Sequence, residues 1–228
     1  KTGFYRWYWR LDEKGVDFPS RSIKKTNSES GGVKVKPGNY RVVLESKNSI
    51  SETEITVKTD PRFEVTGKTI EDRYNYSKQI EEFFKKVTDA VNQLNESKKI
   101  LGTYKSRIEK NDNESDKILI KKISENITQI EEITSFFLGK EDDRQGIVRN
   151  PENSVIKRLN NAKRYVGSRP NTITNTEKIL LEHAYNDLKK GLEKTNNYYN
   201  DNWESLKNEI ESIDLSEFKK IKNIRLDN

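Results

Sequence analysis

The first part of the chain has hydrophobic side chains at alternate positions, which is the two-residue period of a β-strand. Residues 3–11 are rich in aromatic side chains, which favour the half-buried surface of a sheet. In a strand these residues divide into two faces, Tyr5, Trp7, Trp9 and Leu11 on one, and Phe4, Arg6, Tyr8 and Arg10 on the other. We therefore predict a first strand here. We expect Tyr5, Trp7 and Trp9 to be buried beneath a sheet, together with side chains of two later strands: Tyr40, Val42, Ile55 and Val57.

Two further strands follow a polar stretch, residues 19–32, which we expect to form a loop. Pro37 and Gly38 occupy the central positions of a predicted turn, because proline fixes φ and glycine accepts a positive φ. After this turn, alternating apolar residues mark two strands: Tyr40, Val42 and Leu44, then Ile55 and Val57. Three strands at this spacing suggest part of an antiparallel β-sandwich. Since three cannot close a sandwich, we expect the remaining strands to lie before residue 1.

The apolar period changes after Asp60-Pro61-Arg62, where proline ends the third strand. Thr69, with Asp72 three residues later, resembles a helix-capping pair. Beyond it, nine of ten positions spaced by three or four residues hold apolar or tyrosine side chains, Ser97 being the exception: positions 76, 80, 83, 87, 90, 94, 97, 101, 104 and 108. This pattern predicts a helix of about forty residues.

Three more helices are predicted downstream. A second spans about 115–138 and is ended by Gly139, a short third covers 155–167, and a very long fourth runs over about 174–213. Helices this long are stable only when they are packed, so we expect the first and fourth to pair antiparallel with the other two alongside. Residues 215–226 are predicted to form a short extra helix or an extended strap. The predicted fold class is α+β, mostly α.

Composition supports this architecture. Hydrophobic residues make up 31% and charged residues 35% of the chain, which suits long helices with one apolar stripe. The net charge of +6 comes from interspersed signs, so the sequence lacks the one-signed stripe of a nucleic-acid-binding surface. It also has no run of 18 apolar residues, so we predict no membrane span. Cysteine is absent, which says little about the redox compartment.

Candidate catalytic groups are few. The single histidine, His183, has no set of metal ligands or nucleophile with which to form a metal site or a catalytic triad. Adjacent carboxylates on a helix point about 100° apart, whereas glycosidase chemistry needs two that face each other across a cleft. Three such pairs occur: Glu81-Glu82, Glu131-Glu132 and Asp142-Asp143. We predict no catalytic residue, no metal site and no cofactor in this chain.

One surface stands out as a candidate interface: Phe4, Arg6, Tyr8 and Arg10. Alternating aromatic and arginine side chains are able to stack on sugars or bases, or the same face packs on strands outside this chain. A second aromatic group, Tyr198, Tyr199 and Trp203, falls on the predicted fourth helix. We expect this group to lie in the bundle core or at a domain contact.

The order of these features resembles one family. The run Trp9-Arg10-Leu11, then Gly31-Gly32, Pro37-Gly38-Asn39-Tyr40, Asp60-Pro61-Arg62 and a long helix is similar to the C-terminal region of bacterial exported proteins with sortilin-type Asp-box β-propellers, often labelled glycosyl hydrolases. The resemblance covers nearly the whole chain. It implies an immunoglobulin-like module of the flagellar hook-capping type over residues 1–65 and a helical bundle over 66–228. It also implies that Asp60, Pro61 and Arg62 couple the sheet to the first helix through hydrogen bonds across the boundary.

In that family any binding or hydrolytic site lies in the propeller, so the resemblance implies no catalytic residue here. The expected function is a non-catalytic, structural and protein-interaction region of an exported, cell-surface or periplasmic protein, partnered by the upstream propeller of the same chain and by other envelope proteins. One alternative is an accessory region of a glycan- or peptide-degrading enzyme whose active site lies upstream. Another is a coiled-coil adaptor or adhesin stalk.

Overall fold

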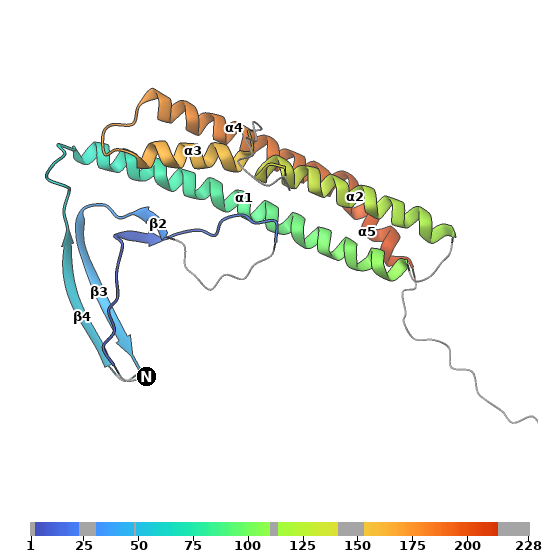
Figure 1. The fold of residues 1–228 in the computed structure, drawn as a ribbon, viewed down its shortest axis with the longest axis horizontal. Helices are drawn as coiled ribbons and strands as arrows, with labels where there is room; N and C mark the ends of the chain where they lie inside the picture. The colour runs from blue at the N-terminus through green and yellow to red at the C-terminus, as the bar shows by residue number, and fades with distance from the viewer. Residues whose placement is uncertain (1–2, 23–30, 48, 110–113, 141–152, 214–228) are drawn as a thin grey trace, which may run out of the picture.

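The computed structural model describes residues 3–22, 31–47, 49–109, 114–140 and 153–213. Within these ranges the protein has an α+β, mostly α fold, as the sequence predicts. Two small antiparallel strand pairs lie at one end of a bundle of long helices (Figure 1). None of the helices described is both long enough and apolar enough to cross a membrane.

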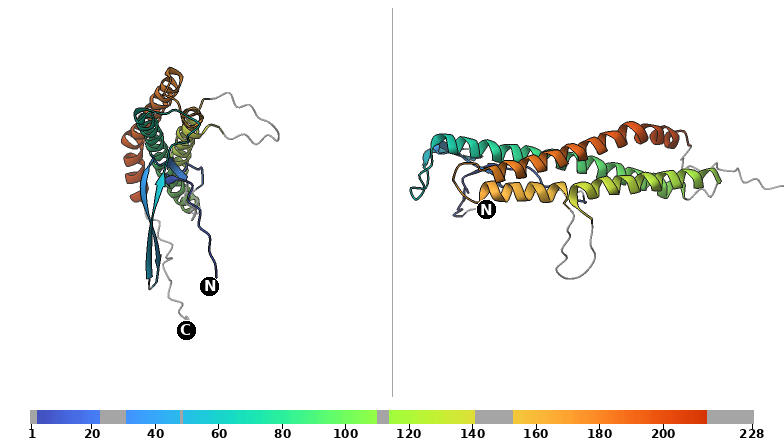
Figure 2. Two further views of the ribbon diagram at one scale, coloured as in Figure 1. Left: turned by 90° about the vertical axis from the view of Figure 1, so that its left-hand side faces the viewer. Right: turned by 90° about the horizontal axis from the view of Figure 1, so that it is seen from above.

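The helices form a bundle with three legs. The first is α1 (Gly67–Ile108), the second is α2 (Glu114–Leu138) followed by α3 (Val155–Gly167), and the third is α4 (Asn175–Tyr198), the π-helical turn η1 (Tyr199–Trp203) and α5 (Glu204–Glu211). Figure 2 shows α2 and α3 end to end, running back along α1. The second leg, with helices of 25 and 13 residues, is thus nearly as long as the 42-residue first leg.

The first and third legs run parallel, which corrects the expectation that the two longest helices pair antiparallel. Arg73 of α1 lies 3.1 Å from Glu177 near the start of α4, and Ser97 lies 2.8 Å from Tyr199 farther along both. The reason is the second leg: because α2 and α3 together return the chain to the start of α1, the next helix runs in the α1 direction. Successive legs remain antiparallel (Figure 1).

The predicted stripe of α1 is confirmed as the core of the bundle. Eight of its ten positions are buried, and the other two, Tyr76 and Tyr104, pack against the core. Ser97 is buried like its apolar neighbours, and its hydroxyl oxygen lies 2.8 Å from that of Tyr199, so the polar exception is satisfied by a hydrogen bond. The capping prediction was wrong. The helix begins after Thr66, whose side chain accepts a hydrogen bond from the Thr69 backbone N–H.

The predicted second and third helices are confirmed. One glycine ends α2, and another allows α4 to pack closely against it. Gly139 follows α2 with φ at +88°, the left-handed conformation with which a glycine ends a helix. Gly191 of α4 lies where a Cβ atom would come within 2.6 Å of the Phe137 ring. Any larger side chain at Gly191 would therefore have to displace the Phe137 ring or separate α4 from α2.

The predicted fourth helix is interrupted, which the apolar spacing did not indicate. The backbone widens into the π turn η1 at Tyr199, and α5 continues the rod beyond Trp203. This turn carries the predicted aromatic group inward: Tyr198 is buried, and Tyr199 and Trp203 pack against the core. Their ring centroids are 5.2 to 6.5 Å apart. An extra residue in one turn changes which side chains face the core, so both tyrosines contribute to it.

The β part contains β1 (Asp12–Lys14), β2 (Gly31–Lys34), β3 (Gly38–Ser46) and β4 (Ser49–Val57). The last two are the predicted second and third strands. The predicted turn at Pro37 and Gly38 was wrong in detail: Pro37 lies at a bend, whereas Gly38 is the first residue of β3, pairs with Val57 and does not have a positive φ. The prediction of a strand over residues 3–11 was wrong, because this segment has no hydrogen-bonded neighbour strand among the described residues. The first strand is the short β1, which pairs with β2 at Gly31 in what was predicted to be a loop.

Residues 15–22, which we call the strap, lie along the bundle after β1. The Thr88 hydroxyl donates a hydrogen bond to the carbonyl of Asp17 at 2.7 Å, and the Asn95 side chain donates to that of Ser20 at 2.8 Å. Phe18 packs edge-on against Phe84, with ring centroids 5.0 Å apart. These contacts join the early part of the chain to the bundle. The division into a β module over residues 1–65 and a bundle over 66–228 stays a prediction.

Candidate interaction surface

Residues 3–11, which we call the aromatic segment, are exposed. This corrects the expectation that Tyr5, Trp7 and Trp9 are buried, since 64%, 81% and 41% of their surfaces are accessible. The candidate interface residues Phe4, Arg6, Tyr8 and Arg10 are exposed too. The Arg6 guanidinium donates a hydrogen bond of 3.5 Å to the Tyr8 hydroxyl. With no strand paired to it in the described structure, the segment buries neither of its faces.

The hairpin of β3 and β4 has one apolar face. Tyr40 pairs with Ile55, and Val42 and Leu44 follow on the same face as the strands run outward. Charged side chains, including Arg41 and Glu45 of β3 and Glu52 and Glu54 of β4, lie on the opposite face. The apolar face is nevertheless open, which corrects the expectation that Val42 is buried: 42% of Val42 and 58% of Leu44 are accessible, and Tyr40, Ile55 and Val57 are half-buried.

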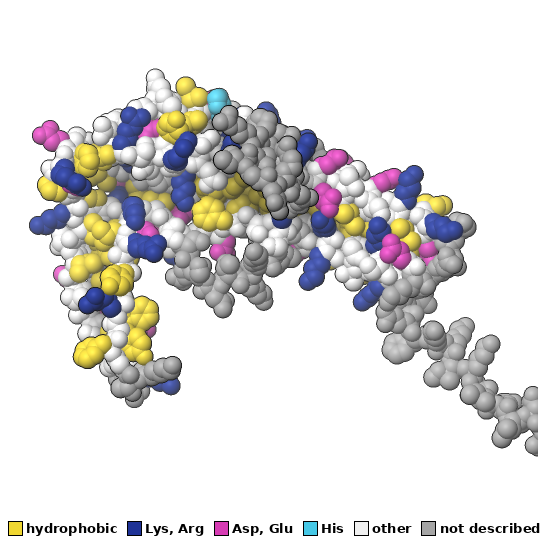
Figure 3. Space-filling model, viewed as in Figure 1, with side chains coloured by type: hydrophobic (Ala, Val, Ile, Leu, Met, Phe, Trp, Pro, Cys, Tyr) yellow, Lys and Arg dark blue, Asp and Glu magenta, His cyan; other side chains and the backbone are white. Residues whose placement is uncertain are grey.

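Aromatic segment and hairpin together make an arm that extends from the bundle. Figures 1 and 2 show both running away from the helices, with the segment over a face of the hairpin rather than in the sheet. They meet where Trp9 packs edge-on against Tyr40, with ring centroids 5.3 Å apart. Since Tyr40 belongs to the apolar face, the segment lies on that side. Figure 3 shows hydrophobic side chains gathered along the arm.

The base of the arm is ordered by hydrogen bonds. The Trp9 indole N–H donates to the carbonyl of Asp12 at 2.8 Å, and the Tyr40 hydroxyl donates to the carbonyl of Lys36 at 2.5 Å. Between them the backbone turns at Leu11, whose φ of +56° is a conformation that leucine seldom adopts. The Val35 N–H donates to the Leu11 carbonyl at 3.0 Å and holds this turn. The base is therefore a defined structure, although the outer arm is uncovered.

The arm is anchored to α1 through Glu13. Its carboxylate accepts hydrogen bonds from the Tyr74 hydroxyl at 2.6 Å and from the Lys78 ammonium at 3.1 Å. These hydrogen bonds, of which the one from Tyr74 has the larger effect, lower the pKa of Glu13 and keep its carboxylate ionised. Lys78 also donates to Glu81 at 2.5 Å, and this bond, together with that to Glu13, raises the pKa of Lys78. The anchor is thus a charged network between β1 and the third and fourth turns of α1.

A second contact reinforces the anchor from the hairpin side. The Lys36 ammonium lies 2.9 Å from a Glu71 carboxylate oxygen and 4.7 Å from the centre of the Tyr74 ring. The pKa of Lys36 is raised by its hydrogen bond to Glu71. Because Lys36 directly precedes the bend at Pro37 and the first β3 residue, Gly38, this contact holds the start of β3 beside α1. The predicted turn residues therefore lie at the base of the arm.

The Asp60-Pro61-Arg62 junction does not make the bonds expected of it. It lies between β4 and α1, but the Arg62 guanidinium donates to Asp60 at 2.6 Å, and Asp60 also accepts from the Arg62 backbone N–H at 3.0 Å. These bonds lower the pKa of Asp60 to about 2. Both side chains are exposed, and the hydrogen bonds found here stay within the turn. Arg62 is close enough to satisfy Asp60 locally, so the anchor at Glu13 joins sheet to helix instead.

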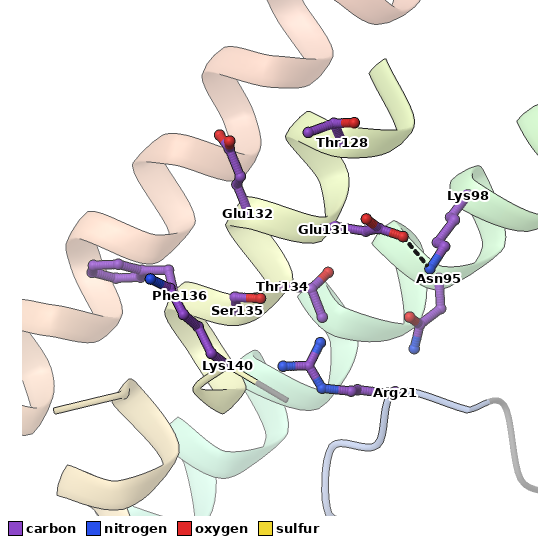
Figure 4. A pocket seen from close by; sticks show the side chains of 10 residues that line it. All are labelled: Arg21, Asn95, Lys98, Thr128, Glu131, Glu132, Thr134, Ser135, Phe136 and Lys140. Atoms are coloured by element: carbon purple, nitrogen blue, oxygen red, sulfur yellow. Dashed lines mark ion pairs between the residues drawn. The ribbon is translucent and has the colours of Figure 1, made fainter. Parts of the chain in front are cut away.

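The described structure has a polar hollow of about 750 Å³ between the strap, α1 and α2 (Figure 4). Lys98 of α1 and Glu131 of α2 form an ion pair of 2.7 Å at its edge. Glu132 points to the other side of α2, as adjacent helical residues do (Figure 4). The two carboxylates therefore do not converge on one point in the hollow, as an acid–base pair would require.

The other candidate groups are placed as follows. His183 lies exposed on α4, and Glu81 is ion-paired with Lys78 while Glu82 faces solvent. Asp142-Asp143 and the predicted segment 215–226 lie outside the described residues. Within the described ranges, no group of three or more histidine, cysteine, aspartate or glutamate side chains is arranged to hold a metal ion.

Sequence reasoning missed the anchor residues Glu13, Tyr74 and Lys78. Tyr74 and Lys78 are four residues apart on one face of α1, a spacing that signals a shared partner. The partner itself, Glu13, is 61 residues from Tyr74 in the chain, and no local pattern joins the two.

Comparison with known proteins gives no match: no family model, no curated protein and no solved structure is similar to this chain.

Proposed function

We propose that this chain is a non-catalytic structural and protein-interaction region at the C-terminal end of an exported, cell-surface or periplasmic β-propeller protein. Its arm docks against a β-structured module that precedes it in the same polypeptide, and its bundle supports the arm. The partner is protein, and the proposal involves neither nucleic acid, nor a membrane span, nor a cofactor.

The observation that supports this proposal most is the uncovered arm. Monomeric proteins seldom expose contiguous apolar surface of this kind unless it binds something. Here Trp7 is 81%, Tyr8 79% and Leu44 58% accessible, on elements whose base is held by defined hydrogen bonds. An exposed surface on an ordered base is what a preorganised docking site needs, because little freedom is lost on binding.

The resemblance to the propeller-associated region is a second line of support. It rests on the order of Trp9-Arg10-Leu11, Pro37-Gly38-Asn39-Tyr40 and Asp60-Pro61-Arg62 before a long helix. The partner it implies is built of β-strands, and the open apolar face of the hairpin is suited to sheet-on-sheet packing. The two arguments are independent, since one uses motif order and the other uses exposure.

The test is binding between this chain and the segment that the parent gene encodes immediately before Lys1, expressed as a separate polypeptide. Isothermal titration calorimetry should detect binding, with the negative heat-capacity change that accompanies burial of apolar surface. Hydrogen exchange should slow in β3, β4 and residues 3–11. The double variant Trp7→Ser, Leu44→Ser should weaken binding by more than tenfold, because both side chains lose their buried contact.

The matched control is Ile179→Ser combined with Ile118→Ser. These side chains are 49% and 64% accessible, comparable to the arm residues, but they lie on α4 and α2. The control should bind as the unmodified chain does. If the two polypeptides do not bind, or if the control variant weakens binding equally, the arm is not the docking surface.

A further inference from the structure

The outer edge of β3 is unpaired. Within the described residues, β4 is the only strand hydrogen-bonded to β3, so the other side of this nine-residue strand has backbone groups without a strand partner. An open edge of this length is a template for pairing with another strand unless its side chains prevent it. The question is therefore which strand the β3 edge accepts.

The register identifies the groups on that edge. Ser46 pairs with Ser49 at the closed end of the hairpin, so these two residues exchange hydrogen bonds. Hydrogen-bonded and non-hydrogen-bonded residue pairs alternate along an antiparallel ladder. The N–H and C=O groups of even-numbered β3 residues therefore point toward β4, and those of odd-numbered residues point outward. The N–H and C=O groups available to a new strand are those of residues 39, 41, 43 and 45.

This edge is complementary to itself. Suppose that a second β3 pairs antiparallel with the two Val43 residues opposite each other. Three of the four outward-facing residues, 41, 43 and 45, then lie opposite outward-facing residues of the other copy, and Asn39 lies beyond the end of the partner strand. Arg41 of each copy then lies opposite Glu45 of the other, so two opposite-charge pairs flank the central valines. On the other face Val42 meets Leu44, which makes the apolar face continuous across both hairpins.

The β4 edge does not share this property. Its outward residues are 50, 52, 54 and 56, so both Glu52 and Glu54 belong to it. Antiparallel pairing of two β4 strands about residue 52, 53 or 54 brings glutamates opposite each other, and like charges there oppose pairing. The two edges of one hairpin therefore differ: like charges oppose self-pairing of β4 in its three central registers, whereas opposite charges favour self-pairing of β3 about Val43.

The charges on β3 are available for this pairing. The Arg41 side chain is 67% accessible and makes a 3.5 Å ion pair with Glu52, which is exposed and screened by solvent. Val43, at the centre of the edge, is 38% accessible. Figure 1 shows the hairpin of β3 and β4 extending clear of the helices.

We propose that two copies of this chain associate through the outer edges of β3, forming a four-stranded antiparallel sheet with the order β4-β3-β3-β4 and a two-fold axis at Val43. The occupant of the edge is a second copy. This goes beyond docking to an upstream module, which concerns the apolar face of the arm and not its edge.

The test is a charge exchange read by sedimentation equilibrium over a range of concentrations. The unmodified chain should show a monomer–dimer equilibrium. Arg41→Glu should place glutamates opposite each other, and Glu45→Arg should do the same with arginines, so each should raise the dissociation constant by roughly ten- to a hundredfold. The double variant Arg41→Glu, Glu45→Arg should restore the dimer, because the pairs are re-formed with reversed signs.

Two further variants keep the result interpretable. Glu52→Arg removes the Arg41 ion pair within one hairpin and leaves the β3 edge unchanged, so it should dimerise normally. Val43→Pro removes an outward N–H that β4 does not use, so it should abolish the dimer while far-UV circular dichroism stays unchanged. A chain that is monomeric at every concentration overturns the proposal. So does a dimer that persists in Arg41→Glu and Val43→Pro, because its interface lies elsewhere.

Discussion

The bundle and the arm contain the same kinds of hydrophobic residue but bury them to opposite degrees. Leu94 in α1 is fully buried and Phe84 is 2% accessible, whereas Leu44 in β3 is 58% and Trp7 81% accessible. The bundle is held by apolar packing along its whole length. The arm is held at its base alone, mostly by hydrogen bonds and ion pairs.

The difference shows what each region requires to be stable. Three long helices bury their stripes against each other and need no further partner. A two-stranded hairpin is marginal alone, because each strand has one neighbour, and here its apolar face is covered only in part by the aromatic segment. The arm therefore depends on its anchor at Glu13 and Trp9, and its outer part is free to bind. The following predictions test this contrast, from the largest expected effect to the smallest.

Removing one core leucine should separate the two regions most clearly. Leu94→Ala should lower the free energy of unfolding by about 2–5 kcal/mol, because it leaves a cavity among packed helices. Leu44→Ala, the same change on the exposed hairpin, should alter it by no more than about 0.5 kcal/mol. Urea titration followed by far-UV circular dichroism measures both. Equal losses would mean that the hairpin is covered in solution.

A buried ion pair should make the bundle sensitive to acid. Burial alone would raise the pKa of Glu177, but hydrogen bonds from Thr174 and Arg73 outweigh it, so that pKa is lowered. The resulting stabilisation is present above the unfolded-state value, about 4.3, and is lost as the pH falls through the lower folded-state value. Glu177→Gln should lower the free energy of unfolding by about 1–3 kcal/mol at pH 7 and flatten its acid dependence.

The matched control for the acid prediction is Glu209→Gln. Glu209 pairs with Lys122 at 2.7 Å, but both side chains are exposed, 39% and 47% accessible. Its loss should change the free energy of unfolding by less than about 1 kcal/mol. Denaturation at a series of pH values measures both variants. A pH dependence that survives Glu177→Gln would assign the acid sensitivity to other carboxylates.

The two tryptophans of the aromatic segment should differ from each other. Trp9→Ala removes the contact with Tyr40 and the hydrogen bond to Asp12, which should cost about 0.5–1.5 kcal/mol. Trp7→Ala removes an exposed side chain and should have almost no effect on stability. Near-UV circular dichroism follows the aromatic residues and far-UV the helices. If Trp9→Ala lowers both melting transitions together, residues 1–65 and 66–228 form one cooperative unit and the two-domain division fails.

The junction should show the smallest effect. Arg62→Ala should return the pKa of Asp60 from about 2 toward the usual value of about 3.9, because the guanidinium that stabilises its ionised form is gone. The denaturation midpoint at neutral pH should not change, since the pair lies in solvent and its bonds stay within one turn. NMR titration of the carboxyl group gives the pKa. A clear loss of stability would restore the coupling role expected from the family resemblance.

Sequence pattern was sufficient where the structure depends on one period along one element. The stripe from Tyr76 to Ile108 predicted both the length of α1 and its buried face, because a helix repeats the same geometry at each turn. The alternation of β3 and β4 likewise predicted two strands with one apolar face, but it did not predict that this face is open. Of the candidate surface, the pattern identified Phe4, Arg6, Tyr8 and Arg10 as a possible interface, and the structure shows them exposed.

Relations between distant elements were decided by tertiary structure alone. The aromatic alternation of residues 3–11 is that of a strand, but a strand also needs a neighbour, and no strand in the described part of the chain is paired with it. The direction of α4 depended on α2 and α3 returning the chain together, and the anchor depended on Glu13 meeting Tyr74 across 61 residues. Periodicity reports which side of an element is apolar. What that side faces depends on non-local contacts, whose energies no local pattern contains.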